Sequence, residues 1–362
     1  MTTILRNPRR GDLPQWDKAG VPLAVHRRLP GYAPTPVVDL PGVATSVGAT
    51  HVSVKDESSR LGLPSFKILG ASWATYRLLV GRLGVEPDWG DIADLRAAIA
   101  PLGHLTLAAA TDGNHGRAVA HVARWLGLGA RIFVPEGTAA ARITGIRSEG
   151  ATVTVVDGTY DDAVRTSARE AADDVLVVSD TSWDGYTEVP AWVIAGYETI
   201  FAEADTQGSD PDTVVVQMGV GALAAAVVRH YAGRATVVVV EPESAACGLR
   251  SAEAGHPVLV PGPHRSIMAG LNCGTVSQVA WPTVAAGTDV FVAIDDASAE
   301  AAMRDLARGG VVAGETGAAG LAGLRALAGS YPLEGQRVLV LNTEGATDPV
   351  AYERIVGSAP AR

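Results

Sequence analysis

The sequence predicts an α/β protein built around mainly parallel sheets, and three observations support this class. The chain of 362 residues is long enough for two domains of roughly 100–200 residues each. From about residue 105, short β-branched runs alternate with longer alanine-rich segments of helical spacing. Several of these runs end in glycine or polar residues, where parallel sheets bind their ligands. We therefore expect two domains, each with a mainly parallel sheet flanked by helices.

The elements follow in order along the chain. The strand-like run HVSVKDES precedes a helix in which Phe66, Leu69, Trp73 and Tyr76 recur at three and four residues. One long helix is predicted over 189–205. The other expected strands are LTLAAA, ARIFVP, TVTVV, VLVVSD, TVVVQMG, TVVVVEP, VFVAI and RVLVLN, with helices after 115, near 138–149, from 160 and from 221.

Composition narrows the kinds of partner. The formal net charge of -10 argues against nucleic acid or an anionic membrane, because both require clustered basic side chains. No run of 18 apolar residues occurs and no apolar stretch follows the N-terminal arginines, so neither a membrane span nor secretion is signalled, and we expect a cytoplasmic protein. Cys247 and Cys273 are too few for a disulfide framework and fit no zinc motif, although they could approach each other. A small-molecule ligand is favoured.

Lys67 is the first candidate functional residue. The chain has only three lysines, at positions 18, 55 and 67, and Lys67 falls in the first turn of a predicted helix among apolar neighbours. The positive end of the helix dipole makes this a poor place for a cation. An amine held there is biased toward the neutral nucleophile that forms a Schiff base. The competing interpretation is that the aliphatic part of Lys67 lies buried and its ammonium group reaches the solvent.

A glycine turn is the second candidate, and it consists of Gly219, Val220, Gly221, Ala222 and Leu223. Glycines allow the tight turn after a strand, and the free amides at the following helix start can bind a phosphate. The turn also matches G-x-G-x-x-A with Glu241 twenty residues beyond Gly221, so a dinucleotide-dependent oxidoreductase is a serious alternative. A turn chosen only for close helix packing remains a third interpretation.

The loop DGNHG, residues 112–116, is the third candidate. It joins a predicted strand to an amphipathic helix, and its polar side chains and exposed amides suit a carboxylate or a ring hydroxyl. An ordinary Asp or Asn cap of the helix would need no ligand. The three candidates together favour a pyridoxal-phosphate enzyme over an oxidoreductase. Such an enzyme needs an amine, a phosphate site and a loop for the substrate carboxylate. The sequence holds all three in that order.

At these residues the chain resembles the fold type II pyridoxal-phosphate enzymes, the group of tryptophan synthase β, threonine dehydratase and threonine synthase. Within that group it is most similar to the diaminopropionate ammonia-lyases. The similarity runs from about residue 29 to 349, nearly the whole chain. The matching stretches are LPGYAPTPVVDLPG, VKDESSRLGLPSFKILGASWA, AATDGNHGRAVA, SDTSWDGYTEVPAWVIAGY, GVGALAAAVV, EPESAACGL, IMAGLNCGTVS, GETGAAGLAGL and NTEGATDP.

The resemblance implies a role for each candidate. Lys67 resembles the lysine that forms the Schiff base with pyridoxal 5'-phosphate, and Asn114 resembles the residue that hydrogen-bonds the ring oxygen of this coenzyme. Residues 219–223 then hold the phosphate. Thr343, with Glu344 beside it, resembles the hydroxyl partner of the pyridine nitrogen. A neutral partner leaves that nitrogen largely unprotonated, which favours elimination over transamination.

Two acids indicate the reaction that the resemblance implies. Asp112 and Asp180 match the acids assigned to binding and proton transfer in the ammonia-lyases, and 2,3-diaminopropionate brings a second ammonium group. One carboxylate can abstract the Cα proton of one enantiomer while the amine of Lys67 serves the other face, so both enantiomers are expected to react. The resemblance therefore implies that the protein eliminates ammonia from 2,3-diaminopropionate to give pyruvate. A cap before the turn at 183–185 is the competing interpretation of Asp180.

Departures from the family pattern keep alternatives open. Pro64 and Ser65 precede Phe66 where asparagine and alanine are expected, Ala346 stands where an acid is common, and Val276 replaces a proline. A serine or threonine dehydratase, a biosynthetic β-replacement enzyme and a binding protein that has lost its chemistry therefore remain alternatives.

The resemblance also implies an architecture. A large domain is expected from residues 1–94 and 188–362, with a smaller α/β domain inserted at 95–187 and the coenzyme between them. The expected partners are a small amino-acid substrate and a second copy of the chain in a homodimer.

Overall fold

The protein forms two compact units, each with its own sheet. The computed structural model describes residues 2–16, 21–111 and 113–361. The first unit comprises residues 1–18, 34–59 and 200–362, and the second comprises 19–33 and 60–199. The second unit therefore takes in segments on both sides of the expected insertion at 95–187, and the domain boundaries given above stay a prediction.

The first unit contains a seven-stranded sheet of order β1-β10-β9-β8-β11-β3-β2. The five central strands run parallel, and the edge strands β1 and β2 pair antiparallel with β10 and β3. Its strands are β1 (Thr3–Arg6), β2 (Val37–Asp39), β3 (His51–Asp56), β8 (Thr213–Gln217), β9 (Thr236–Pro242), β10 (Val290–Ile294) and β11 (Arg337–Asn342). Strands β8 and β10 are buried at every position, as a parallel sheet covered on both faces requires.

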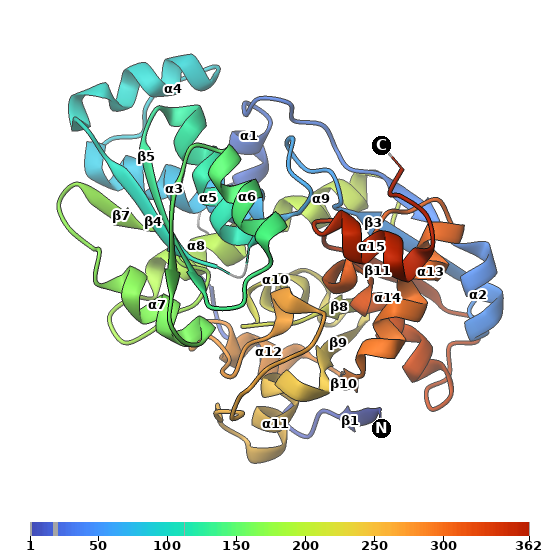
Figure 1. The fold of residues 1–362 in the computed structure, drawn as a ribbon. Helices are drawn as coiled ribbons and strands as arrows, with labels where there is room; N and C mark the ends of the chain where they lie inside the picture. The colour runs from blue at the N-terminus through green and yellow to red at the C-terminus, as the bar shows by residue number, and fades with distance from the viewer. Residues whose placement is uncertain (1, 17–20, 112, 362) are drawn as a thin grey trace. The chain divides into compact units, whose positions relative to one another are not determined.

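Helices cover this sheet, as Figure 1 shows. Helix α14 packs against β8, β9, β10 and β11, and α10 packs against β8 and β9. The helices are α2 (Pro41–Val47), α10 (Ala222–Tyr231), α11 (Cys247–Ala254), α12 (Trp281–Gly287), α13 (Asp296–Arg308), α14 (Glu315–Ala328) and α15 (Pro349–Val356), with short 3-10 turns η2 (Glu243–Ala245) and η3 (Ala269–Leu271). The glycine turn follows β8, and Thr343 follows β11.

The second unit contains a fully parallel sheet of order β6-β5-β4-β7. Its strands are β4 (Thr106–Ala110), β5 (Gly129–Pro135), β6 (Thr152–Val156) and β7 (Val175–Val177). Its helices are α1 (Pro22–His26), α3 (Lys67–Leu83), α4 (Ile92–Ile99), α5 (Asn114–Leu126), α6 (Ala140–Ser148), α7 (Tyr160–Ala168) and α8 (Glu188–Gly196), with the 3-10 turn η1 (Ala100–Leu102). The predicted class, two mainly parallel sheets flanked by helices, is confirmed.

Helices α3 and α8 pack closely because glycine stands at their contact. A Cβ on Gly70 would lie 2.6 Å from Cε1 of Tyr197, and one on Gly196 would lie 2.6 Å from the carbonyl oxygen of Leu69. Any side chain at these two positions would therefore push the helices apart. This packing fixes the first turns of α3, where Lys67 lies.

The long helix expected over 189–205 is two helices. Helix α8 ends at Gly196, and α9 (Glu198–Thr206) begins after Tyr197. The amide of Tyr197 donates to the carbonyl of Ile194, three residues back, which tightens the last turn. Continuous helical spacing of apolar residues hides such a break, because both helices bury the same kind of face.

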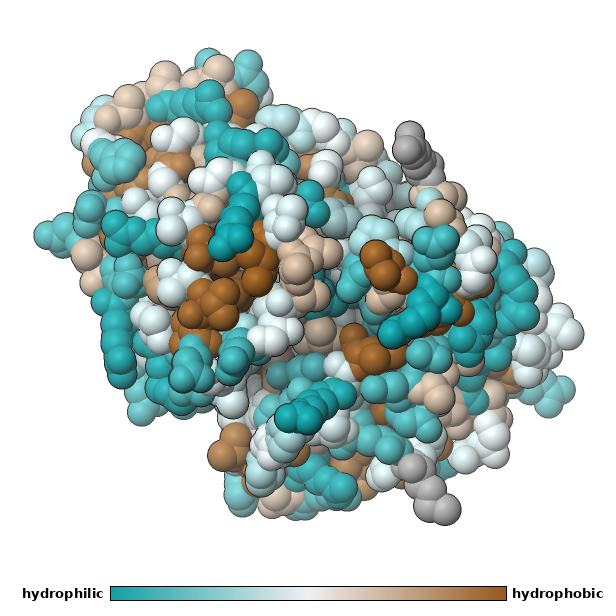
Figure 2. Space-filling model, viewed as in Figure 1, coloured by the Kyte–Doolittle hydropathy of each residue, from teal (hydrophilic) through white to brown (hydrophobic). Residues whose placement is uncertain are grey.

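The visible surface of the molecule is mostly hydrophilic, with apolar residues in a few groups (Figure 2). The exposed large apolar side chains are Leu13, Val21, Val85, Val155, Leu259 and Val350. Among the described residues, no helix combines the length and the apolar character needed to cross a membrane.

Candidate active site

Lys67 is the first residue of α3, and its amine contacts Asp180. The Nζ atom of Lys67 donates a hydrogen bond to Oδ2 of Asp180 over 2.6 Å. The two side chains are only 18% and 5% exposed. The ring of Phe66 lies 5.5 Å from Nζ. The amine is thus mostly buried beside a carboxylate and an aromatic ring, and it does not extend to solvent as the competing interpretation required.

Asp180, which follows β7, is a buried carboxylate held by two donors. Besides Lys67, the hydroxyl of Tyr160 donates to Oδ1 of Asp180 over 3.2 Å. Burial by itself would raise the pKa of Asp180, but the charges of Lys67 and His115 and the two hydrogen bonds hold that pKa well below its usual range. The side chain accepts no backbone N–H among the described residues, so it does not cap the turn at 183–185.

His115 is a second titratable group beside Asp180, and its sequence position alone predicts no role for it. Its Nε2 lies 2.8 Å from the carbonyl oxygen of Val178, which can only accept, so Nε2 carries the hydrogen. Its Nδ1 lies 4.0 Å from Oδ2 of Asp180. The available signal was its place directly after Asn114, at the start of α5. Tyr160 carried no comparable signal, because only the fold brings α7 to Asp180.

Tyr186 braces the loop that carries Asp180. Its hydroxyl donates to the carbonyl of Val177 over 2.7 Å and accepts from the amide of Ser179 over 3.1 Å. Its ring stacks on Trp183 with the centroids 4.1 Å apart. Burial raises the pKa of Tyr186 well above its usual value, so the hydroxyl stays protonated and both hydrogen bonds persist.

The DGNHG loop leads into α5, which begins at Asn114. Gly113 has a φ of 151°, and its amide donates to the hydroxyl of Thr111 over 2.8 Å. A Cβ on Gly113 would lie 2.9 Å from Cδ of Arg142, so the loop is closely covered at this point. Asp112 lies outside the described residues, and its role stays a prediction.

The glycine turn of the first unit presents free backbone donors. Gly221 has a φ of 103° and precedes the ten-residue helix α10. Among the described residues, no acceptor binds the amides of Gly219, Val220, Gly221, Ala222 and Leu223. A Cβ on Gly219 would lie 2.9 Å from the carbonyl oxygen of Gly270, so only glycine fits there. Largely buried amides at a helix start favour an anion such as a phosphate.

Thr343 lies directly after β11 and is linked to the glycine turn by Gln217. The amide Nε2 of Gln217, at the end of β8, donates to Oγ1 of Thr343 over 2.8 Å. Both side chains are buried. The neighbouring Glu344 accepts the amide of Thr316 at the start of α14 over 3.3 Å. Sequence reasoning missed Gln217, because a glutamine at a strand end has no distinctive pattern.

Glu241 is the acid that a dinucleotide site would direct at a ribose. It is instead fully buried at the end of β9, where it accepts the amides of Gly248 over 2.7 Å and Leu249 over 2.8 Å. The carboxylate therefore stabilises the start of α11 and cannot reach a ribose. Nothing at this acid supports a dinucleotide-dependent oxidoreductase.

The free energy of unfolding should fall as the pH rises, because the buried Glu241 loses its proton. Burial raises the pKa of Glu241 to about 7, against the lowering effect of the amides of Gly248 and Leu249 and of Cys247. The usual pKa of a glutamate is about 4.5, so the protonated folded form adds stability at low pH, which is lost as the pH rises through about 7. Between pH 5 and 8 this contribution is about 2–3 kcal/mol. Urea denaturation of wild type and Glu241→Gln should show the extra decline in the wild type only; equal declines would contradict the prediction.

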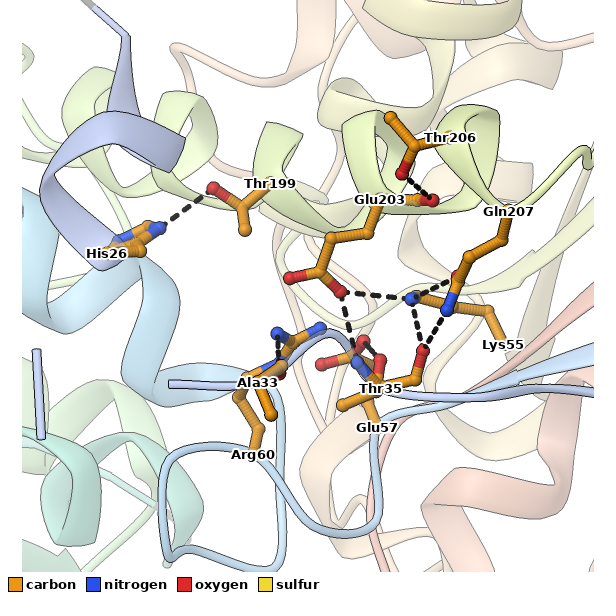
Figure 3. A network of polar contacts seen from close by, with 10 residues as sticks. All are labelled: His26, Ala33, Thr35, Lys55, Glu57, Arg60, Thr199, Glu203, Thr206 and Gln207. Carbon is orange, nitrogen blue, oxygen red and sulfur yellow. Dashed lines mark hydrogen bonds and ion pairs between the residues drawn. The ribbon is translucent and has the colours of Figure 1, made fainter. Parts of the chain in front are cut away.

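Lys55 is the other described lysine, and a buried network occupies it (Figure 3). Its Nζ donates to the carbonyl of Thr35 over 2.7 Å, to Oε2 of Glu203 over 3.0 Å and to Oε1 of Gln207 over 2.9 Å. The hydroxyl of Thr35 donates to Glu57 over 2.6 Å. All three ammonium hydrogens of Lys55 donate hydrogen bonds, so its amine is not available as a nucleophile. Lys67 therefore stays the candidate for the Schiff-base lysine.

Breaking the Lys55 pair should destabilise the first unit strongly. Lys55 and Glu203 are 0% and 2% exposed. Glu203→Ala leaves a buried charge uncompensated and is expected to cost about 3–5 kcal/mol of unfolding free energy. The double variant Lys55→Met with Glu203→Met should cost clearly less, because no unpaired charge remains. Urea denaturation of the wild type, Glu203→Ala and the double variant tests this, and a double variant as unstable as Glu203→Ala would contradict it.

The described residues contain neither a disulfide nor a metal site. Cys247 and Cys273 are both buried and form no disulfide. Burial raises the pKa of the Cys247 thiol, and Glu241 and Cys273 add to the effect. Among the residues that the structure describes, no three His, Cys, Asp or Glu side chains gather to hold a metal ion.

The predicted site residues fall into two groups. The second unit carries Lys67, Asn114 and Asp180, and it brings Lys67 and Asp180 into contact. The first unit carries residues 219–223 and Thr343, joined through Gln217.

Comparison with known proteins identifies related chains. The model of the family described as "Pyridoxal-phosphate dependent enzyme" matches residues 28–344. A diaminopropionate ammonia-lyase of Salmonella typhimurium is 36% identical in an alignment of 365 positions. This alignment covers 92% of this chain and 90% of that protein. The crystal structure of the Escherichia coli diaminopropionate ammonia-lyase with D-serine has a TM-score of 0.89 and 33% identity, covering 98% of this chain and 97% of that one. The same enzyme with an aminoacrylate-PLP azomethine reaction intermediate gives a TM-score of 0.87 at 33% identity, with the same coverage.

Proposed function

The chain belongs to the family of pyridoxal-phosphate dependent enzymes, and we propose that it releases ammonia from 2,3-diaminopropionate, giving pyruvate. The identity of 36% over 92% of the chain with a diaminopropionate ammonia-lyase carries this proposal. One water is consumed and two molecules of ammonia are formed per pyruvate, which balances the atoms. The enzyme is thus a carbon-nitrogen lyase that acts on a small amino acid.

The described residues fit pyridoxal 5'-phosphate chemically. Lys67 offers a mostly buried amine for its aldehyde, and residues 219–223 offer buried amides without acceptors for its phosphate. Thr343 offers a neutral hydroxyl for the ring nitrogen, and Asn114 is the partner for the ring oxygen. When bound, the coenzyme supplies an electron sink for negative charge at the substrate Cα.

Asp180 and Lys67 would share the proton transfers. The depressed pKa of Asp180 keeps it anionic at neutral pH, so it can hold an ammonium group of the substrate or the protonated amine of Lys67, 2.6 Å away, while Lys67 carries the proton. Asp112 is the proposed second acid, which serves the opposite face of Cα. With one base on each face, both enantiomers of the substrate react.

A substrate panel tests the proposal. Purified protein is given D- and L-2,3-diaminopropionate, D- and L-serine and L-threonine, and pyruvate or 2-oxobutyrate and ammonia are measured. We expect the diaminopropionates to give the highest kcat/KM, with two ammonia per pyruvate. A higher kcat/KM for serine or threonine would make the enzyme a dehydratase. A protein that binds the coenzyme but releases nothing from any substrate would be a binding protein that has lost its chemistry.

Two finer expectations are part of the proposal. A homodimer is expected from the family, and a cytoplasmic location is the second expectation. Analytical ultracentrifugation would show a mass near twice 37.2 kDa for the dimer. A species at 37.2 kDa across the working concentration range would rule the dimer out.

A further inference from the structure

We infer that Arg142 enables the DGNHG loop to bind the carboxylate of the substrate, because its positive charge offsets the negative charge of Asp112. This inference rests on the proposed function, which gives the loop a small amino acid and makes Asp112 an ionised acid. It adds to that function a specificity-determining residue on α6, a helix that carries none of the predicted site residues.

The aliphatic part of Arg142 lies across Gly113. A Cβ placed on Gly113 would lie 2.9 Å from Cδ of Arg142 and 3.3 Å from both its Cβ and its Cγ. Since Nε of the guanidinium group is bonded directly to Cδ, the charged group begins one bond beyond this contact. Arg142 is half-buried, so solvent screens its charge less than that of an exposed arginine. The loop therefore has a cation beside its second residue.

Arg117 holds α6 in this position. Helix α6 packs on α5 (Figure 1). The amide of Arg117 donates to the carbonyl of Gly113 over 3.0 Å, and its Nε donates to Oε1 of Glu149, directly after α6, over 3.2 Å. A Cβ on Gly145 of α6 would lie 3.3 Å from Nη1 of Arg117. One residue thus contacts both the loop and the end of α6, and this keeps Arg142 over Gly113.

The neighbouring cations are paired with acids or lie far along the helix. Nε of Arg117 is 3.2 Å from Glu149, and Nζ of Lys67 is 2.6 Å from Asp180. Arg124 also contacts Glu149, but it lies in the last turn of α5, at the opposite end from the loop. These groups therefore add little net charge at the start of α5.

The remaining charges decide whether the loop attracts a carboxylate. The start of α5, a helix of 13 residues, contributes about half a positive charge, whereas ionised Asp112 contributes a full negative one. The helix alone therefore cannot offset this acid, and the loop would repel a carboxylate. Arg142 adds a full positive charge, so the sum becomes positive and the loop attracts it.

The test is the binding of D-serine and of D-serinamide to the coenzyme-loaded protein, followed by the visible absorption of the coenzyme. The first compound carries a carboxylate and the second a neutral amide in its place. Titration at pH 8.5 lies well above the usual histidine pKa of about 6.5, so histidine charges do not contribute. Arg142→Met should raise the Kd of D-serine roughly 10- to 100-fold. The Kd of D-serinamide should stay within about twofold.

Three further variants separate charge from structure. Arg142→Lys keeps the positive charge and should retain most of the affinity for D-serine. Adding Asp112→Asn to Arg142→Met removes the repelling acid as well, and it should recover most of the lost affinity. Arg147→Met is the matched control, since it makes the same change on an exposed residue of the same helix. It should leave both Kd values unchanged.

Several results would overturn the inference and leave the proposed function standing. Folded Arg142→Met that loses affinity for both compounds equally would show a structural role only, and one that loses affinity for neither would show no role. A double variant that binds no better than Arg142→Met, or a wild type that binds neither compound, would also contradict the inference. Protein that binds no coenzyme would overturn it together with the proposed function. If Arg142→Met does not fold, Arg142→Gln takes its place with the same expected results.

Discussion

Replacing Lys67 by alanine should abolish covalent capture of the coenzyme and lower kcat/KM for ammonia release by roughly 10³- to 10⁶-fold. Lys67 is the described lysine whose amine stands beside an acid and an aromatic ring, whereas every ammonium hydrogen of Lys55 is bound in the network of Figure 3. Lys55 therefore cannot substitute for it. Hydride reduction followed by peptide mass spectrometry should find the pyridoxyl tag on Lys67 in the wild type and no tag in the variant.

Lys67→Arg is the matched control for this prediction. Arginine keeps a positive charge beside Asp180, so the fold and the ion pair persist. A guanidinium is not deprotonated in proteins and forms no Schiff base, so activity should be lost as in the alanine variant. If the wild-type tag is found on another residue, or if Lys67→Arg retains activity, the role of Lys67 is wrong.

Periodicity and strand-end chemistry predicted most of the fold because they reflect local physics. The runs around β8 and β11 are apolar and β-branched, and both are almost wholly buried in parallel pairing. The spacing of Phe66, Leu69 and Trp73 predicted the helix that starts at Lys67. The break at Tyr197 was not, because the packing of Tyr197 against Gly70 comes from the tertiary fold.

The candidate site could be proposed from the sequence where polar or glycine residues gather in one short segment. The glycine turn at 219–223 and the DGNHG loop are each defined by a few consecutive residues. The support around them comes from distant segments: Tyr160 reaches Asp180 across 20 residues, and Gln217 reaches Thr343 across 126. No sequence window holds such pairs. The resemblance implies Asp180 and Thr343, and the structure shows that Tyr160 and Gln217 donate hydrogen bonds to them.

Replacing Asp180 by asparagine should lower kcat by about 10²- to 10⁴-fold while the coenzyme stays bound. The change keeps the shape of the side chain and one acceptor oxygen, but it removes the negative charge that faces the amine of Lys67 2.6 Å away. Asp184→Asn is the matched control, since it makes the same chemical change on an exposed residue of the same loop. Its kcat should stay within about twofold of the wild type, as expected for a surface substitution.

The pH dependence separates a catalytic charge from a structural one. The pKa of Asp180 lies well below its usual value, so the carboxylate is ionised at every pH above about 4 and its stabilising contribution is lost only in stronger acid. The loss of kcat in Asp180→Asn should therefore be the same from pH 6 to 9, and the acidic limb of the rate profile should stay in place. Another titratable group would then set that limb. A limb that disappears with Asp180→Asn would instead mean that this carboxylate titrates in the working range, and the ion pair with Lys67 would not control its charge.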